Sequence, residues 1–465
     1  MLFNSYTFVF LFLPLVLVGW WSIPTKNARL LFLALASYVF YGWWDFRFVP
    51  LMLISTSADF LAALAIERSR RPAARKAYLC ALLVFNLGIL ATFKYYDFFA
   101  DNYNGIAKLL GVTARLPLLG LILPIGISFY TFNSISYTID VYRQRIRPAK
   151  NFLEFATFVA MFPHLISGPI VRYSDMDDQF AELPTRPDSG QLVVGVCFFV
   201  IGMIKKVLIA DFLAARLVTP LFGHAHQMVG AWLGSLAYTL QIYFDFSAYS
   251  DMAVGLAFFL GLRFPQNFDS PYKSVNISEF WRRWHMSLSF WLRDYLFIPL
   301  GGSRGTNLQT ARNLALTMFL GGLWHGASWT FVLWGLYHGV LLVVHQVSKR
   351  RGWVPRSDAA SIAITFVFVT FGWVLFRAPT IHSACATLAS MLGAHGVESA
   401  HAIVRLVARP ELGLLLGGLV LVFWAPNTWE LRYPRTRWFA ALLAFGFVVC
   451  TLRFAASSPF LYFQF

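Results

Sequence analysis

Residues 1–21, MLFNSYTFVFLFLPLVLVGWW, contain no charged side chain, and a bilayer crossing needs only about 20 such apolar residues. No Lys or Arg precedes the apolar run, whereas a cleaved signal peptide begins with a positively charged region. We therefore interpret residues 6–21 as a retained first membrane span.

The rest of the chain shares this apolar character. Of its 465 residues, 58% are hydrophobic, 18% are aromatic and 13% are charged, whereas soluble domains have about 25% charged residues. Such a chain cannot cover its surface in water, which excludes soluble enzymes, disordered chains and fibrous proteins. The net charge of +16 comes from short basic runs between apolar segments, as the positive-inside rule requires. We therefore predict no nucleic-acid partner.

The hydropathy pattern predicts an all-α, polytopic membrane helix bundle with roughly 10–13 transmembrane or re-entrant helices, at about 20 residues per crossing. Basic runs at residues 26–29, 68–76 and 143–150 alternate between the first five spans, which places these three loops in the cytoplasm. Candidate spans are residues 6–21, 28–44, 48–66, 77–93, 118–139, 190–209, 229–244, 248–262, 313–335, 358–376, 411–425 and 438–456, with 332–347 as a further possible crossing.

Two stretches do not read as simple spans. Residues 152–170 are apolar but contain Pro163, Gly168 and Pro169, which favours a re-entrant segment enclosed by protein. Between residues 263 and 312, charged side chains alternate with Trp and Phe. We expect short interfacial or re-entrant helices there.

The densest polar cluster within apolar sequence is GGLWHGASWTFVLWGLYHG, residues 321–339. An ionisable side chain at membrane depth is costly and is a functional candidate, so His325 is a candidate general base. The alternative is a helix-packing motif, because glycines at GxxxG spacing bracket both His325 and His338. On one continuous helix these histidines would be about 20 Å apart. We therefore expect the partner of His325 elsewhere, first at His285, for which the alternative is a basic-aromatic membrane anchor.

Other residues are weighed in the same way. Asp59, Asp245 and Asp251 lie in apolar sequence, which indicates a water-lined cavity or pairing with Arg. The alternative for each is a buried structural ion pair or a helix cap. The four cysteines are scattered singly, so we predict neither a disulfide framework nor a metal site. The GxSxG, HExxH, P-loop and GxGxxG motifs are missing from the sequence.

Three strings taken together resemble the membrane-bound O-acyltransferase family, and within it the bacterial group that contains the alginate O-acetyltransferase membrane subunit. They are YFDFSAYSDMAVG (243–255), FWRRWHMSLSFWLRDYLFIPLGG (280–302) and LWHGASWTFVLWGLYHG (323–339). LPIGISFYTFNSISYTIDVYR (123–143) and MFPHLISGPIVRY (161–173) resemble the same group. The resemblance covers nearly the whole chain and is weakest over about 385–460.

The resemblance implies a bundle with a central funnel in the bacterial inner (cytoplasmic) membrane. We expect one integral-membrane acyltransferase domain over residues 1–465, with a functional core at about 120–340. The implied reaction is O-acetylation of an exported polysaccharide such as alginate, with acetyl-CoA or another thioester as the cytoplasmic donor and no bound cofactor. The acetyl group would cross the membrane to a periplasmic acetyltransferase partner or to the polymer. The implied catalytic residue is His325, with His285 as the second functional residue.

Arg282, Arg283 and Arg293 lie close to His285 in the sequence. We expect them to bind the donor's phosphates, because guanidinium forks match phosphate oxygens. Anchoring to anionic membrane lipid is the alternative. For the whole chain, the alternative function is a proton-coupled transporter with a His and Asp relay. Cellulose, peptidoglycan or teichoic acid are alternative acceptors.

Overall fold

A computed structural model describes residues 1–224, 227–353, 355, 357–434, 436–456, 458 and 460–461. Every regular element in these residues is helical, which confirms the all-α prediction. The chain divides into two compact units, Met1–Gly195 with Ala253–Pro265 and Val196–Met252 with Gln266–Phe465. Two helices, α9 (Ser189–Ile204) and α12 (Met228–Phe259), contribute residues to both units.

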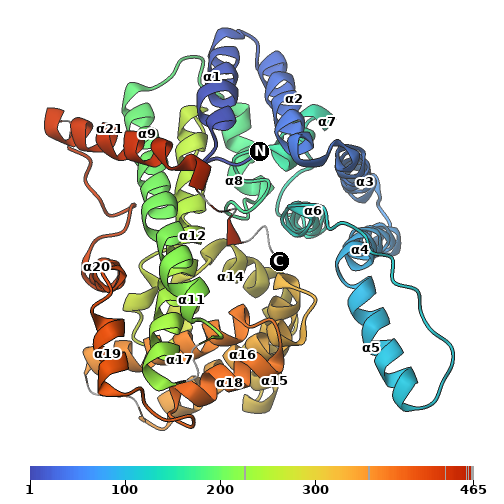
Figure 1. Cartoon of the computed structure of the whole chain (residues 1–465). Coiled ribbons are helices and arrows are strands. Elements are labelled where there is room, and N and C mark those ends of the chain that lie inside the picture. Colours follow the sequence, from blue (N-terminus) through green and yellow to red (C-terminus); the bar gives the residue numbers. More distant parts are fainter. Residues whose placement is uncertain are drawn as a thin grey trace. The chain divides into compact units, whose positions relative to one another are not determined.

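The first unit is formed mainly by the N-terminal helices (Figure 1). In it, α2 packs against α7, and α3 packs against both α4 and α6. A cluster of phenylalanine rings, including Phe8, Phe40 and Phe162, fills its core. The elements are η1 (Phe8–Phe12), α1 (Leu13–Ser22), α2 (Lys26–Asp45), η2 (Phe46–Phe48), α3 (Val49–Arg68), α4 (Pro72–Lys94), α5 (Tyr96–Leu109), α6 (Ile127–Tyr142), α7 (Phe152–Ala160) and α8 (Tyr173–Ala181).

One predicted span in this unit begins too early. The prediction was residues 118–139, but α6 starts only at Ile127 and residues 112–124 form no regular element. Pro124 cannot donate a backbone hydrogen bond, and Gly126 has φ 78, a left-handed conformation that suits glycine. Together they delay the helix. The sequence analysis also did not predict α5.

The proline-containing stretch of this unit behaves as expected. Helix α7 ends at Ala160, and residues 161–170 are buried without forming a helix. Part of this segment is held by side chains: the Phe162 backbone N–H donates to Ser37 Oγ at 3.1 Å. A ring nitrogen of His164 lies 2.9 Å from the Phe158 carbonyl oxygen. The predicted enclosure of non-helical backbone by protein is confirmed, and the re-entrant course of this segment stays a prediction.

The second unit contains the block that was predicted to form short helices. This block does form short helices, namely α13, α14 and η6. Its elements, apart from α9 and α12, are η3 (Lys205–Ala210), α10 (Asp211–Leu213), η4 (Ala214–Val218), α11 (Thr219–Leu221), η5 (Pro271–Lys273), α13 (Ile277–Arg283), α14 (Met286–Leu292), η6 (Arg293–Phe297), α15 (Asn307–His325), α16 (Trp329–Arg350), α17 (Asp358–Arg377), α18 (Ile381–Met391), α19 (Ala400–Val407), α20 (Glu411–Trp424), α21 (Arg437–Leu452) and η7 (Phe454–Ala456).

Within the described residues, five helical stretches are long and apolar enough to cross a membrane, or six if a bent pair is one span. They are Lys26–Arg68, Pro72–Lys94, Ser189–Leu221, Trp329–Arg350 and Asp358–Arg377. This confirms a multi-pass helical membrane protein. One division is wrong: residues 229–244 and 248–262 were predicted as two spans but lie almost entirely in α12, a single helix of 32 residues.

The predicted span at 313–335 is also wrong, because the helix breaks in its middle. Helix α15 ends at His325 and α16 starts at Trp329. Between them Gly326 is extended, with φ −172, and the Ser328 side chain accepts a hydrogen bond from the Thr330 backbone N–H at 3.3 Å. A serine cap of this kind starts a new helix.

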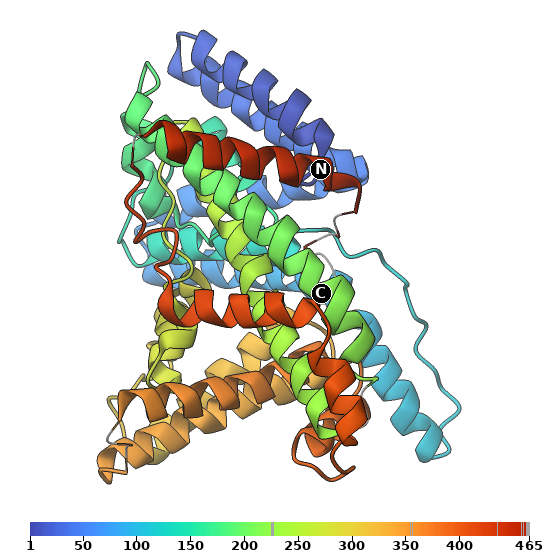
Figure 2. The same cartoon turned by 60° about the vertical axis from the view of Figure 1, so that its left-hand side comes forward.

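The two helices pack side by side as a hairpin (Figure 2). A Cβ atom on Gly322 would lie 3.1 Å from the Gly335 Cα and would overlap the Phe331 carbonyl oxygen. Gly322 and Gly335, one from each GxxxG pair, therefore join α15 to α16, because only glycine permits so close an approach of two backbones. The hairpin places the break, and with it His325, at one end of this helix pair.

Candidate active site

His325 is the last residue of α15, at the start of the hairpin break, and it is buried. Three aromatic rings meet its imidazole edge-on: Trp324 and Trp334 at 5.0 Å and Phe376 at 5.1 Å between centroids. These rings come from α15, α16 and α17. They enclose the imidazole in an apolar pocket that strengthens any hydrogen bond or charge interaction made there.

His285 lies between α13 and α14, and it is also buried. Its ring meets Phe246 edge-on at 4.6 Å and Trp324 at 6.2 Å. Trp324 is also the neighbour of His325, so the structure brings the two predicted histidines to one indole ring. His285 and His325 therefore share one aromatic neighbour, although 40 positions separate them in the sequence (325 − 285).

The sequence analysis missed a third member of this site. The Nδ1 atom of His285 lies 3.1 Å from the side-chain oxygen of Asn267. Asn267 precedes His285 by 18 positions and lies outside any helix, in the connection between α12 and η5. No local motif marks it, because only the fold of this connection brings it to the histidine.

His338 lies in the same aromatic cluster, on α16. Its ring is 5.0 Å from Trp334 and 5.2 Å from Trp281. Because α15 ends at His325, the continuous helix assumed for the two histidines does not exist, and both pack against Trp334. Neither ring nitrogen of His338 has a hydrogen-bond partner among the described residues.

The three carboxylates that lie in apolar sequence are held in structural interactions. Lys205 pairs with Asp251 at 2.6 Å, and Lys206 pairs with Asp245 at 2.7 Å. Asp59 accepts a hydrogen bond at 2.7 Å from a side-chain amide on α4. The ion-pair alternative is therefore confirmed for Asp245 and Asp251, with lysines as the partners. Carboxylates fixed in this way give little support to a proton-relay transporter.

Two of the three candidate phosphate-binding arginines already have acidic partners. Arg283 pairs with Glu279, one helical turn away, at 2.8 Å. Arg293 pairs with its neighbour Asp294 at 2.7 Å. These interactions neutralise much of the positive charge that a phosphate would meet.

Arg282 differs, because it is exposed and no carboxylate in the described part of the chain forms an ion pair with it. Its charge and that of Lys349 on α16 both act on the ring of His345. Arg282 and Lys349 therefore form a local cluster of two cations, and no described carboxylate forms an ion pair with either. Such a cluster is the arrangement that attracts a polyphosphate.

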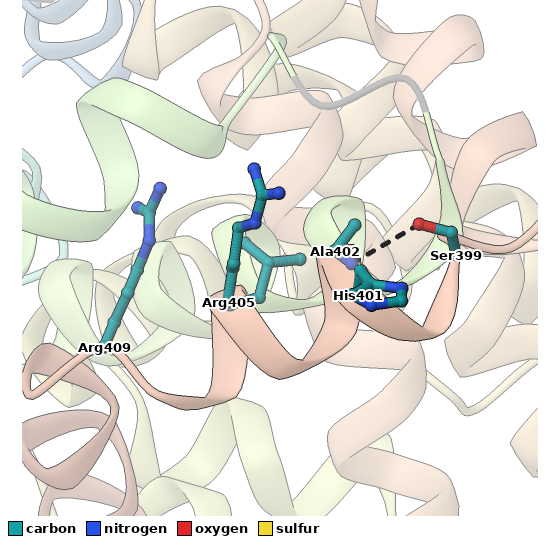
Figure 3. Close-up of a pocket in the computed structure, with 6 residues that line it drawn as sticks. Ser399, His401, Ala402, Arg405 and Arg409 are labelled. Carbon is teal, nitrogen blue, oxygen red and sulfur yellow. Dashed lines mark hydrogen bonds between the residues drawn. The ribbon is translucent and has the colours of Figure 1, made fainter.

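A separate cavity of about 340 Å³ lies beside α19. In Figure 3, Arg405 on α19 and Arg409, which follows the end of α19, extend in the same direction. The cavity is lined by Ser399, His401, Ala402, Arg405, Leu406 and Arg409, and thus by neither candidate histidine. Among the described residues, no three His, Cys, Asp or Glu side chains are grouped so as to hold a metal ion.

Residues 44–383 match the sequence model of MBOAT, the membrane-bound O-acyltransferase family. The chain belongs to this family, and it is an O-acyltransferase. It is 46% identical over 393 residues to the probable alginate O-acetylase AlgI of Azotobacter vinelandii, covering 84% of this chain and 78% of the relative. The corresponding Pseudomonas putida protein is 41% identical over 496 residues, covering 100% of both chains.

A relative named for a different activity is also similar. The peptidoglycan O-acetyltransferase of Helicobacter pylori is 39% identical over 435 residues, which cover 86% of this chain and 81% of the relative. The family resemblance drawn from the three sequence strings is thereby confirmed.

Proposed function

We propose that this protein O-acetylates an exported polysaccharide, using a thioester donor such as acetyl-CoA that is reached from the cytoplasm. The observation that carries the proposal is the pair of buried histidines against Trp324 in a chain of the O-acyltransferase family. The relatives named as alginate O-acetylases favour alginate as the acceptor. The peptidoglycan relative makes that polymer the second candidate.

In the proposed reaction His325 is the general base. Its unprotonated nitrogen takes the proton from the acceptor hydroxyl while that oxygen attacks the thioester carbonyl carbon. The new C–O bond forms, the C–S bond breaks, and the departing thiolate takes the proton from the imidazolium. A positioned base of this kind contributes about 10²–10⁴-fold in rate, and the aromatic pocket around the ring limits access of competing water.

His285 is proposed as the second functional residue. It packs against Trp324, as His325 does, and is proposed to act on the same reacting groups. Arg282, with Lys349, is proposed to bind the donor's phosphates, because no carboxylate of the described residues forms an ion pair with either cation. Arg283 and Arg293 contribute less, since Glu279 and Asp294 pair with them.

We place the protein in the bacterial inner membrane, where a cytoplasmic donor and an exported acceptor lie on opposite sides. A periplasmic acetyltransferase subunit is the proposed partner that receives the acetyl group or completes its transfer. The helices that are long enough to span a bilayer support the membrane location.

The proposed function is tested with purified protein in vesicles, supplied with acetyl-CoA labelled in the acetyl group. We expect donor consumption and transfer of alkali-labile label to alginate, with less transfer to peptidoglycan glycan strands. If the donor is consumed and the label appears on peptidoglycan alone, peptidoglycan replaces alginate as the proposed acceptor. Absence of thioester cleavage, with and without the partner subunit, would contradict the proposed donor.

A further inference from the structure

The segment that contains Asn267 is bonded to the chain on both sides of His285. The backbone N–H of Met286 donates to the Asn267 carbonyl oxygen at 2.9 Å, and the N–H of Asp269 donates to the Arg283 carbonyl oxygen at 2.9 Å. These two bonds fix the Asn267 backbone beside the short link between α13 and α14. The position of its side chain relative to His285 is therefore set by main-chain hydrogen bonds.

The orientation of the Asn267 amide follows from its neighbours. The backbone N–H of Ser287 lies 3.2 Å from one end of the amide, and a backbone N–H can only donate. That end is therefore the oxygen Oδ1, which also accepts from the Ser287 hydroxyl at 2.9 Å. The nitrogen end donates to the Ser250 hydroxyl on α12 at 3.0 Å.

The orientation of the amide determines the tautomer of His285. Its Nδ1 atom is 3.1 Å from Asn267 Oδ1, and an oxygen acceptor requires a proton on Nδ1. A neutral imidazole has only one N–H, so Nε2 is then the nitrogen that can accept a proton.

The backbone of His285 is also unusual. Its φ of 42 and ψ of 55 lie in the left-handed region, which few residues other than glycine adopt. Such conformations persist where the surrounding structure holds them, and they are frequent at functional sites. The hydrogen bonds from Met286 and Ser287 to Asn267 supply that support.

We propose that Asn267 is a positioning residue that holds His285 as the Nδ1-protonated tautomer, so that Nε2 is the atom available to the reacting groups. This inference rests on the proposed function, in which His285 is the second functional residue. Phe246, Phe268 and Trp324 surround the ring and keep it from turning. Asn267 thus acts on the reaction only through His285.

The tautomer is measured directly by ¹⁵N NMR of histidine-labelled protein, with His285→Gln used to assign the signals by difference. In the unmodified protein we expect the His285 Nε2 signal in the range of an unprotonated ring nitrogen. A protonated Nε2 would overturn the proposal, and this result needs no Asn267 variant to fold.

Kinetics on three variants separate positioning from a general structural role. Asn267→Ala removes the oxygen that accepts the hydrogen bond from His285 Nδ1. We expect kcat to fall about 10-fold or more with the donor KM unchanged, because the lost interaction is one that acts in the transition state. Asn267→Asp keeps an oxygen facing Nδ1, and the Ser250 hydroxyl can turn to donate to it, so we expect it to restore most of kcat. Ser250→Ala, the matched control, leaves Oδ1 in place and should keep both kcat and the tautomer.

The outcomes distinguish this inference from the proposed function. If Asn267→Ala retains wild-type kcat, or if Asn267→Asp is no better than Asn267→Ala although both fold, Asn267 is not a positioning residue. If instead the unmodified protein transfers no acetyl group at all, the proposed function fails, and the NMR measurement still decides the tautomer of His285.

Discussion

His285 and His325 pack edge-on against the same indole ring, that of Trp324, at centroid distances of 6.2 and 5.0 Å. One histidine comes from the link between two short helices and the other from the end of α15. Trp324 precedes His325 directly, so the hairpin break that positions His325 also positions the shared ring. The fold thus gives the two histidines a shared aromatic neighbour, and their joint role in one site stays a prediction.

The close packing of the α15–α16 hairpin predicts the effect of a single methyl group. Gly322→Ala would bring a Cβ against the Phe331 carbonyl oxygen and Gly335, and overpacking of this kind costs about 1–3 kcal/mol. We expect a lower melting temperature of the purified protein in detergent and reduced activity, because the break at His325 shifts. The matched control is Gly417→Ala on α20, where nothing lies within 4 Å of the added Cβ. If both variants melt like the wild type, the hairpin does not depend on the glycine contact.

His338 is expected to be a packing residue. Both of its ring nitrogens lack partners in the described residues, and its surroundings are aromatic. Leaving a polar group buried without a partner costs about 1–3 kcal/mol. His338→Met should therefore keep activity, with a melting temperature equal to or above that of the wild type. A folded His338→Met protein without activity would show instead that the ring nitrogens bind substrate or water in the working enzyme.

The basic cluster at Arg282 predicts a selective effect on the donor. Arg282→Gln should raise the KM for acetyl-CoA by about 10-fold, which corresponds to ~1.4 kcal/mol, with little change in kcat. Arg293→Gln is the matched control, since Asp294 already pairs with that guanidinium.

Two other outcomes would relocate the phosphate site. An unchanged KM together with a loss of stability in membranes would assign Arg282 to lipid anchoring. A rise in KM for Arg405→Gln alone would place the phosphates in the cavity beside α19.

The alternation of basic loops predicts that residues 68–76 and 143–150 face the cytoplasm. Single cysteines at Ser69 and Lys150 test this, in a background where the exposed Cys80 and Cys385 are replaced by serine. Lys150 is preferred to Gln144, whose φ of 58 strains any residue placed there. An impermeant thiol reagent should label these cysteines only after cells are opened. Labelling in intact cells at either position would show that the predicted topology is wrong.

The class of fold was predictable because composition and span length depend on the bilayer and not on details of packing. Boundaries failed where glycine and proline act within apolar sequence, at the start of α6 and at Gly326 between α15 and α16. A hydropathy profile does not detect these helix breaks. The division of α12 failed for the opposite reason, since Asp245 is paired with Lys206 inside the protein and does not end the helix.

The site was predicted in part. His285 and His325 were selected from the cost of burying an ionisable group and from the family resemblance. Asn267, the partner of His285, was missed, and outside the candidate site the lysine partners of Asp251 and Asp245 were missed as well, because each contacts a residue far away in the sequence. Such partners are set by the tertiary fold, and a single sequence carries no local signal for them.

The central claim, that His325 is the general base, is tested most directly by measuring acetyl transfer with the His325→Gln variant in vesicles. Glutamine keeps a hydrogen-bonding side chain at the end of α15 but cannot take the proton, so it separates catalysis from packing. With His338→Met as the matched buried-histidine control, we predict that His325→Gln folds normally and that its transfer rate falls by about 10²–10⁴-fold. Near-wild-type transfer by a folded His325→Gln protein would contradict the claim and would move the search for the base to His285.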